Sequence, residues 1–158
     1  MIKNIADDAK ESGAQQLLLT HNIFIAWKTQ YNLGIPIIDE HHRGIVSVIN
    51  SLHFGMQNNY IEDMLTSIID MMYDYTNIQF KIEEDFLEKI YFPNVKRHHE
   101  LHLELSSQLE KMGKRSMLGK DPYQIMDFLK QWWINHICLE DLVFRNHLLK
   151  LTEQSAKK

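Results

Sequence analysis

The sequence predicts an all-α protein, an antiparallel up-down-up-down four-helix bundle preceded by an N-terminal arm. Apolar residues recur at steps of three and four along four long segments, which is the period of an amphipathic helix. These segments lack the sustained alternation of a half-buried strand. Short connections containing Gly, Pro or Asn separate them, and helices of similar length joined by short connections favour an antiparallel bundle.

The first two helices are predicted around apolar stripes at residues 38–56 and 65–90. Gly34 and Pro36 interrupt the chain before the first stripe, and residues 55–59, with one Gly and two Asn, separate it from the second. Both stripes are long enough to cross a bundle from end to end, so we expect these two helices to be antiparallel neighbours.

The third and fourth helices are predicted around stripes at residues 95–112 and 125–144. Pro93 and Asn94 mark the break before the third helix. The stretch 113–119 begins and ends with Gly and is expected to end that helix. Pro122 follows shortly afterwards and suits the first turn of the fourth helix, because a helix leaves its first N–H groups unpaired in any case.

Residues 23–150 are expected to form the bundle, residues 1–22 an N-terminal extension and residues 151–158 a C-terminal tail. Three acidic residues interrupt the place where a signal peptide would be apolar, and no window approaches the ~18 apolar residues of a membrane span. We therefore expect a cytoplasmic protein without membrane contact. The extension is either a partly ordered tail or a docking segment for a protein partner.

Charge and cysteine content argue against two further classes. The chain has 17 Lys and Arg against 21 Asp and Glu, a net charge of −4, and no basic stripe, so nucleic acid is a poor candidate for its partner. The single cysteine, Cys138, excludes an intramolecular disulfide. The nine histidines among 158 residues are the unusual feature of the composition, and they indicate a site.

Four histidines lie on predicted core faces, where a plain bundle would place leucine. His98 and His102 are four residues apart, so they differ in direction by only about 40° and can chelate one ion from one helix face. His42 and His136 lie on the apolar faces of the first and fourth helices. A single buried histidine is usually a hydrogen-bonded core residue, but four converging ones predict a metal site, because a metal satisfies one ring nitrogen of each.

Carboxylates would complete such a site. Glu83 shares a face of the second helix with Gln79, four residues earlier. On the fourth helix, Glu140 lies about 40° from His136 in direction and Asp141 about 140°, so α-helical geometry alone favours Glu140. Nitrogen and oxygen donors without thiolates suit iron, manganese or zinc, and two bridging carboxylates would favour a pair of ions inside the bundle.

The chain resembles the bacterial hemerythrins over residues 24–149 in the order, the spacing and the apolar neighbours of these residues. The segments that carry the resemblance are Ile38–His42, Gln79–Glu84, His98-x-x-x-His102 and Trp133–Asp141, with Trp27 and Tyr31–Ile35 in the N-terminal arm. The resemblance implies two non-haem iron ions, bridged by carboxylates and an oxo group. It also implies reversible binding of O2, for storage, delivery or sensing, rather than an enzymatic activity.

The resemblance also implies a role for each site residue. The implied metal ligands are His42, Glu83, His98, His102, His136 and Asp141. The three histidines of the third and fourth helices would fill one iron, that of the first helix would hold a second iron left open to O2, and the two acids would bridge both. The family pattern thus selects Asp141 over Glu140, against the α-helical argument. An apolar O2 pocket is implied at Trp133, Ile137 and Phe80.

Gln79 departs from the family pattern, because the bacterial hemerythrins have a histidine ligand of the open iron at this position. Three outcomes follow: Gln79 binds metal through its amide oxygen, water or another residue takes the place, or the second iron binds weakly. We expect two metals to bind, with faster oxidation to the ferric form. The alternatives to O2 carriage are an enzyme that turns over O2, peroxide or NO, and a redox- or oxygen-sensing module that acts on a partner chain.

Overall fold

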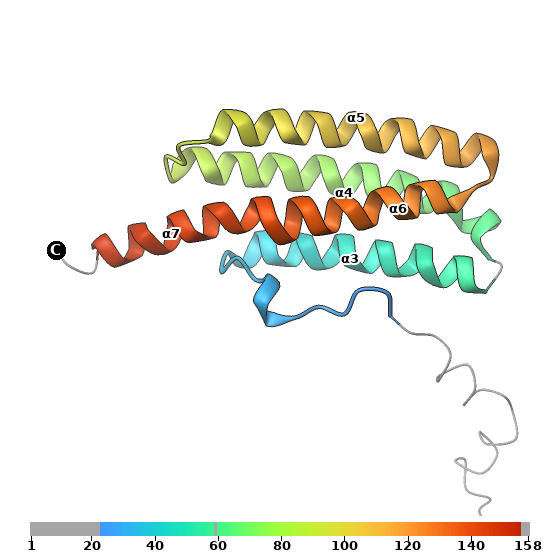
Figure 1. Cartoon of the computed structure of the whole chain (residues 1–158), viewed down its shortest axis with the longest axis horizontal. Helices are drawn as coiled ribbons and strands as arrows, with labels where there is room; N and C mark the ends of the chain where they lie inside the picture. Colours follow the sequence, from blue (N-terminus) through green and yellow to red (C-terminus); the bar gives the residue numbers. More distant parts are fainter. Residues whose placement is uncertain (1–22, 59, 156–158) are drawn as a thin grey trace, which may run out of the picture.

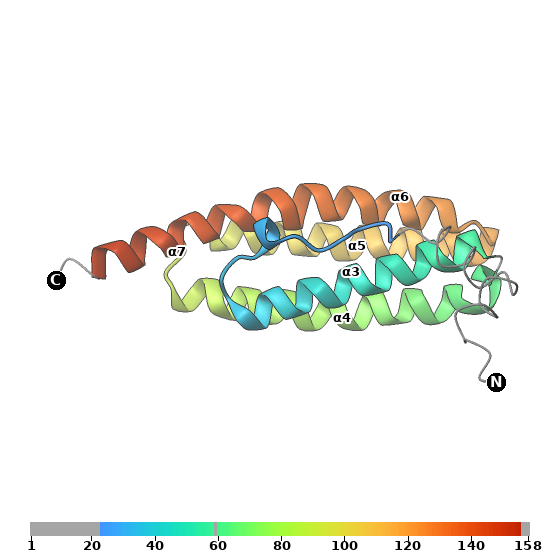
Figure 2. The same ribbon diagram turned by 90° about the horizontal axis from the view of Figure 1, so that it is seen from below.

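The computed structural model describes residues 23–58 and 60–155, and it confirms the predicted all-α four-helix bundle (Figure 1). Four long rods run antiparallel, and Figure 2 shows them as two layers of two. No strand occurs in these described ranges. The rods are α3 (Pro36–Gln57), α4 (Ile61–Lys89), α5 (Val95–Gly119) and a fourth rod made of α6 (Pro122–Trp132), the π-helix η2 (Trp133–Glu140) and α7 (Asp141–Ser155). The proposed docking segment, residues 1–22, lies outside the described residues.

The N-terminal arm enters α3 through a carboxylate-bound turn. Asp39, in the first turn of α3, accepts the backbone N–H of Leu33 at 2.6 Å and that of Gly34 at 3.1 Å. Gly34 has a φ of 84°, a backbone conformation that residues with a side chain rarely adopt and that therefore favours glycine. Pro36 then starts the helix at a position that needs no N–H donor.

The arm lies across the seam between α3 and the fourth rod (Figure 2). The backbone N–H and C=O of Ile25 each form a 2.9 Å hydrogen bond with the side chain of Asn50 on α3. Trp27, beside the short 3-10 helix η1 (Thr29–Tyr31), packs edge-on against Trp133 of the fourth rod, with 5.9 Å between ring centroids. The arm is therefore part of the folded domain.

The third helix is longer than the sequence predicts, because α5 continues through the stretch 113–119 to Gly119. Gly113 is buried against α4: a Cβ there would lie 2.8 Å from Tyr73 Oη and 2.9 Å from Ile69 Cγ2. This glycine allows two helices to approach closely instead of ending one. The chain turns only at Lys120, which is left-handed with a φ of 50°.

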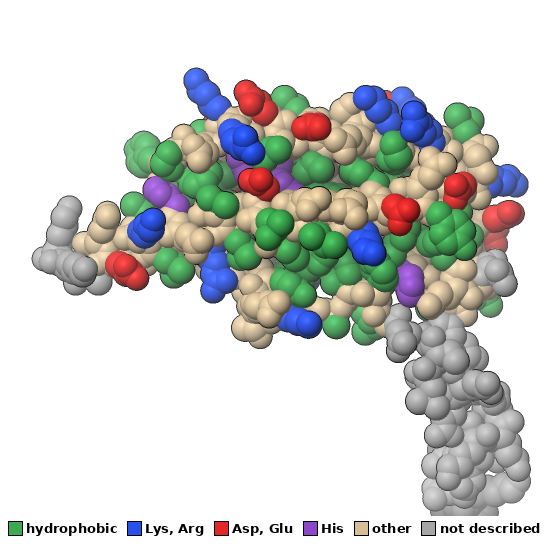
Figure 3. Space-filling view, viewed as in Figure 1, with side chains coloured by type: hydrophobic (Ala, Val, Ile, Leu, Met, Phe, Trp, Pro, Cys, Tyr) green, Lys and Arg blue, Asp and Glu red, His purple; other side chains and the backbone are tan. Residues whose placement is uncertain are grey.

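The fourth rod also extends further than expected. It continues as α7 to Ser155, into residues 151–158 that the sequence assigns to a tail, and Figure 1 shows it projecting beyond the other rods. No helix formed by residues 23–58 and 60–155 has the length and apolar character needed to cross a membrane. Charged side chains of both signs are spread over the face in Figure 3.

The buried core consists of two apolar clusters with a polar layer between them. On α3, Ile38 belongs to one cluster and Ile45 to the other, and His42 lies between them. On α4, Glu83 likewise lies between Leu87 of the first cluster and Phe80 of the second. On the fourth rod, Asp141 lies between Phe144 of the first cluster and Ile137 of the second. The sequence therefore places these three polar residues at one level of the bundle, with apolar side chains on both sides of them.

Candidate metal centre

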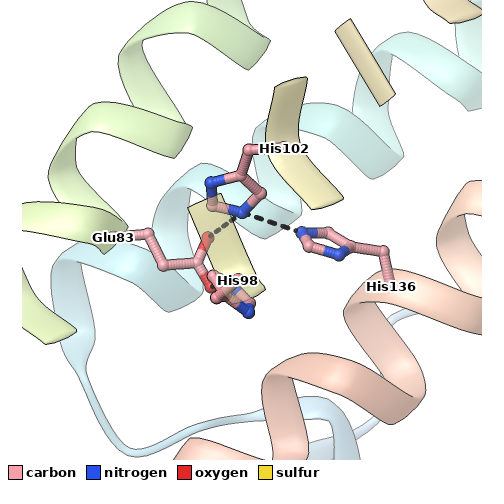
Figure 4. A group of neighbouring side chains, drawn as sticks. All are labelled: Glu83, His98, His102 and His136. Atoms are coloured by element: carbon pink, nitrogen blue, oxygen red, sulfur yellow. Dashed lines mark hydrogen bonds and ion pairs between the residues drawn. The ribbon is translucent and has the colours of Figure 1, made fainter. Parts of the chain in front are cut away.

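One half of the polar layer is a group of three imidazoles and a carboxylate. Glu83 projects from α4, His98 and His102 from α5, and His136 from η2, and Figure 4 shows them pointing toward one another. One ligand atom from each lies within 4.8 Å of the others, and all four side chains are buried. The Nε2 atoms of His102 and His136 are 3.1 Å apart, and His98 Nε2 lies 3.5 Å from Glu83 Oε1.

The other half consists of His42, Glu83 and Asp141, again with one ligand atom each within 4.8 Å. Asp141 faces both halves: its Oδ2 lies 3.4 Å from His42 Nε2, and its Oδ1 lies 3.5 Å from His136 Nε2. Glu83 belongs to both groups. Two overlapping groups that share carboxylates can hold two cations side by side.

The donor atoms of this layer fit a metal because protein groups leave them unpaired. Six of its buried side-chain atoms have no hydrogen-bond partner among the described residues: His42 Nδ1 and Nε2, Glu83 Oε1, His98 Nε2, and both carboxylate oxygens of Asp141. Each such group costs about 1–3 kcal/mol when buried unpaired. Two imidazole nitrogens at right angles on one ion, each about 2.1 Å from it, would lie about 3 Å apart, close to the separation found for His102 and His136.

The electrostatics of the centre also suit a cation. Burial lowers the pKa of His102 to about 2 and that of His136 to about 3, so both rings stay neutral, the form that binds metal. Burial opposes the ionisation of Glu83, but His98, whose Nε2 lies 3.5 Å from Glu83 Oε1, and the other nearby histidines outweigh it and hold the pKa of Glu83 far below its usual range. Burial, with Glu83 alongside, raises the pKa of Asp141 well above its usual value.

A π-helix brings Asp141 into the centre in place of Glu140. The backbone N–H of Asp141 donates to the carbonyl of His136, five residues earlier, and such bonds align residues five apart on one face. Asp141 is fully buried, whereas Glu140 points outward, with its carboxylate 3.9 Å from the guanidinium of Arg97. The α-helical argument for Glu140 is therefore wrong here, because η2 winds more loosely than an α-helix.

Gln79 lies beside the centre but is only weakly tied to it. The side chain is 1% exposed, its Nε2 lies 3.4 Å from Glu83 Oε2, and its Oε1 has no partner among the described residues. The amide nitrogen thus faces the shared carboxylate, and the amide oxygen is left available.

The three predicted pocket residues are buried, at different places. Phe80 stacks face to face on His102, with 3.7 Å between centroids, and meets His136 edge-on at 5.7 Å. Ile137 is 1% exposed and follows His136 directly. Trp133 packs against the arm, 5.2 Å from the ring of Tyr31. Phe80 therefore forms an apolar wall of the centre, whereas Trp133 joins the arm to the fourth rod.

The seam between α5 and the fourth rod connects the centre with the surface. Histidine side chains are visible in this seam in Figure 3. A cavity of about 240 Å³ is lined there by His136 and Trp132, and a smaller one of about 30 Å³ by His98 and Glu140. Two histidines of the centre thus also border open space.

Glu84 was missed by the sequence interpretation, because it points about 100° away from Glu83 and no stripe includes it. Its Oε1 lies 2.7 Å from His102 Nδ1 and its Oε2 lies 2.9 Å from His99 Nδ1. A possible signal was its pairing with His99, each residue directly following a predicted ligand on neighbouring helices. His99 is exposed at the outer end of this contact.

Comparison with known proteins gives one consistent result. The family model described as Hemerythrin HHE cation binding domain matches residues 33–148, which include every residue of the centre. The Bacteriohemerythrin of Stenotrophomonas maltophilia is 27% identical over 135 residues, 85% of this chain and 88% of that protein. The Bacteriohemerythrin of Pseudomonas aeruginosa (strain UCBPP-PA14) is 28% identical over 118 residues, covering 74% and 76%. The Hemerythrin-like protein of Naegleria gruberi is 24% identical over 122 residues, covering 77% and 92%.

Proposed function

This chain belongs to the hemerythrin family, and from that premise we propose that it is a non-haem di-iron protein that binds O2 reversibly. The observation that carries the proposal is the pair of overlapping ligand groups that share Glu83, with Asp141 facing both halves. Nitrogen and oxygen donors without thiolate suit iron. Four-helix bundles build two-ion carboxylate centres from inward-facing side chains of this kind.

The two halves differ in a way that suits ligand binding. His98, His102 and His136 supply three imidazoles to one ion, whereas His42 is the single imidazole of the other half. The second ion therefore has fewer protein donors and keeps room for a small ligand. When bound, ferrous iron supplies the electrons that O2 takes up on binding and returns on release.

The chain itself controls access and protonation around that ligand. Phe80 and Ile137 present apolar surface beside the histidines and restrict water. His102 and His136 stay neutral at physiological pH because burial lowers the pKa of both rings. Less water and fewer protons beside the bound ligand favour release of O2 over its loss as peroxide. Storage, delivery and sensing of O2 are all served by this reversible step.

Metal counting combined with oxygen cycling tests the proposal. Chelator-treated protein is reloaded with ferrous iron without oxygen and desalted, and iron is counted per chain. We expect two irons, and charge-transfer absorption that appears with O2 and fades when O2 is removed, over several cycles. Glu140→Gln is the matched control and should behave as the parent. Fewer than two irons, or absorption that never reverses, would contradict the proposal.

Gln79 favours a second candidate function, turnover of O2, peroxide or NO. An amide at this position offers a neutral oxygen instead of an imidazole, and this changes the electron density at the open ion. The same oxygen-cycling experiment separates the two functions. Catalytic consumption of peroxide or NO by the loaded protein, with rapid loss of the absorption, would favour the enzyme.

A further inference from the structure

We propose that Glu84 is a positioning residue of the metal centre: held at the surface by His99, its carboxylate sets the ring orientation and the protonated nitrogen of His102. This inference rests on the proposed function only in requiring that the centre binds a metal. Glu84 itself lies outside both groups of candidate ligands, since its carboxylate contacts the outer side of the His102 ring.

The contacts form a bridge from the surface to the centre. Glu84 extends from α4 and uses one carboxylate oxygen for each of two imidazoles on α5, at 2.7 Å for His102 and 2.9 Å for His99. Exposure falls along the bridge: the side chain of His99 is 52% exposed, that of Glu84 23% and that of His102 2%. Because His99 and His102 are three residues apart, both reach the same carboxylate from one helix face.

This arrangement determines which nitrogen of His102 carries the proton. A carboxylate accepts hydrogen bonds, so the contact at 2.7 Å places the proton on Nδ1. Nε2 then carries the lone pair and points inward, 3.1 Å from His136 Nε2, from which it can accept a hydrogen bond when no metal is bound. Phe80, stacked parallel at 3.7 Å between centroids, holds the plane of the same ring. His102 is thereby fixed in both tautomer and orientation before a metal arrives.

The contact distinguishes His102 from His42, whose Nδ1 is buried without a hydrogen-bond partner among the described residues. A carboxylate hydrogen-bonded to a ligand imidazole makes that imidazole a stronger donor. The ion held by His102 should therefore favour its higher oxidation state more than it would without Glu84. The three-histidine half is thus the electron-rich half of the centre.

The test compares Glu84→Gln with Glu88→Gln. Gln keeps the size and an acceptor oxygen but removes the charge, and Glu88 is an exposed glutamate one turn further along the same helix. Two quantities are measured: the affinity of the chelator-treated protein for Co²⁺, and the reduction potential of the iron-loaded protein. For Glu84→Gln we expect a roughly 10- to 100-fold weaker affinity and a higher potential. Glu88→Gln should match the parent in both.

A third variant, His99→Gln, tests the outer contact and keeps the metal ligands and Glu84 intact. It should weaken Co²⁺ binding by less than Glu84→Gln does, because the carboxylate keeps its contact with His102. Circular dichroism confirms that each variant is helical, and a shift in potential is a readout that a purely structural role would not produce.

The outcomes separate this inference from the proposed function. If the parent binds metal and Glu84→Gln equals Glu88→Gln in affinity and potential, the positioning role is overturned while the proposed function stands. If the expected differences appear in protein that binds metal but does not bind O2 reversibly, the positioning role is supported and the proposed function fails. If the parent binds no Co²⁺ or iron, both are overturned.

Discussion

Replacing Asp141 by Asn should stabilise the metal-free protein and weaken its binding of metal. Both carboxylate oxygens of Asp141 are buried without a hydrogen-bond partner among the described residues, and Glu83 lies alongside. Relief of a buried unpaired charged group is worth about 1–3 kcal/mol. For a chain of this length, each kcal/mol raises the melting temperature by about 2–4 °C.

The pH dependence of this gain follows from the pKa of Asp141. Burial, followed by the neighbouring Glu83, raises the pKa of Asp141 well above its value of 3.8 in an unfolded chain. The carboxyl therefore destabilises the folded state as the pH rises from 3.8 toward the folded pKa, and it costs nothing below 3.8. The advantage of Asp141→Asn should be present at pH 7 and absent near pH 3.5.

The assay is urea unfolding of chelator-treated parent, Asp141→Asn and Glu140→Gln at both pH values. Glu140→Gln removes the same charge one residue away, at a side chain that is 41% exposed, and should change stability by less than about 0.5 kcal/mol. Added Zn²⁺ at a thousand times its Kd should stabilise the parent by about 4 kcal/mol, and Asp141→Asn by clearly less at the same concentration. Equal stability of parent and Asp141→Asn at pH 7, or an equal gain in Glu140→Gln, would refute the reasoning.

Three further predictions concern the centre and the helix contacts. Gln79→His should slow oxidation of the O2-bound form to the ferric form, because it adds an imidazole donor; equal or faster oxidation, followed optically beside the parent, would contradict this. Gly113→Ala should destabilise the fold by about 1–3 kcal/mol, because the added Cβ would press on the facing helix α4. Gly119→Ala should leave stability unchanged, because the atom nearest to its added Cβ would be 3.9 Å away. Thermal melting of the two variants beside the parent measures the difference. The free energy of unfolding of the metal-free protein, measured with urea, should fall by about 2 kcal/mol as the pH is lowered from 6.5 to 5. An unchanged free energy of unfolding would argue against neutral buried rings. Burial lowers the pKa of His102 to about 2 and of His136 to about 3, so only the unfolded chain takes up these protons, and a buried carboxyl that protonates in the folded state offsets part of the loss.

The fold could be predicted because its signals are local. Apolar side chains spaced for one helix face predicted all four rods, and the structure confirms the bundle. The same periodicity predicted that His98 and His102 share a face and that His42 lies among apolar residues, and the structure places all three in the buried layer. A residue's direction on a regular helix depends only on its number, so such statements need no tertiary information.

The predictions that failed depend on contacts between helices. Gly113 was expected to end a helix, but α5 continues past it. Because glycine has no side chain, Tyr73 of the neighbouring rod can approach the backbone closely at this position. Helix periodicity did not single out Glu84, because its importance comes from two histidines on another helix. A local pattern cannot show what faces a residue from elsewhere in the chain.

The sequence by itself determined the helical class, the four amphipathic rods and the histidines that face inward, since each follows from the constant turn of an α-helix. The resemblance to the hemerythrins selected Asp141 over Glu140 without a physical reason, and only the tertiary structure supplies that reason, because it shows Asp141 in the buried layer and Glu140 outside it. The fourth rod contains a π-helical segment, in which the carbonyl of His136 accepts the N–H five residues ahead instead of four. That single change of hydrogen-bond register reverses the faces of two adjacent acids, and nothing in their spacing reveals it.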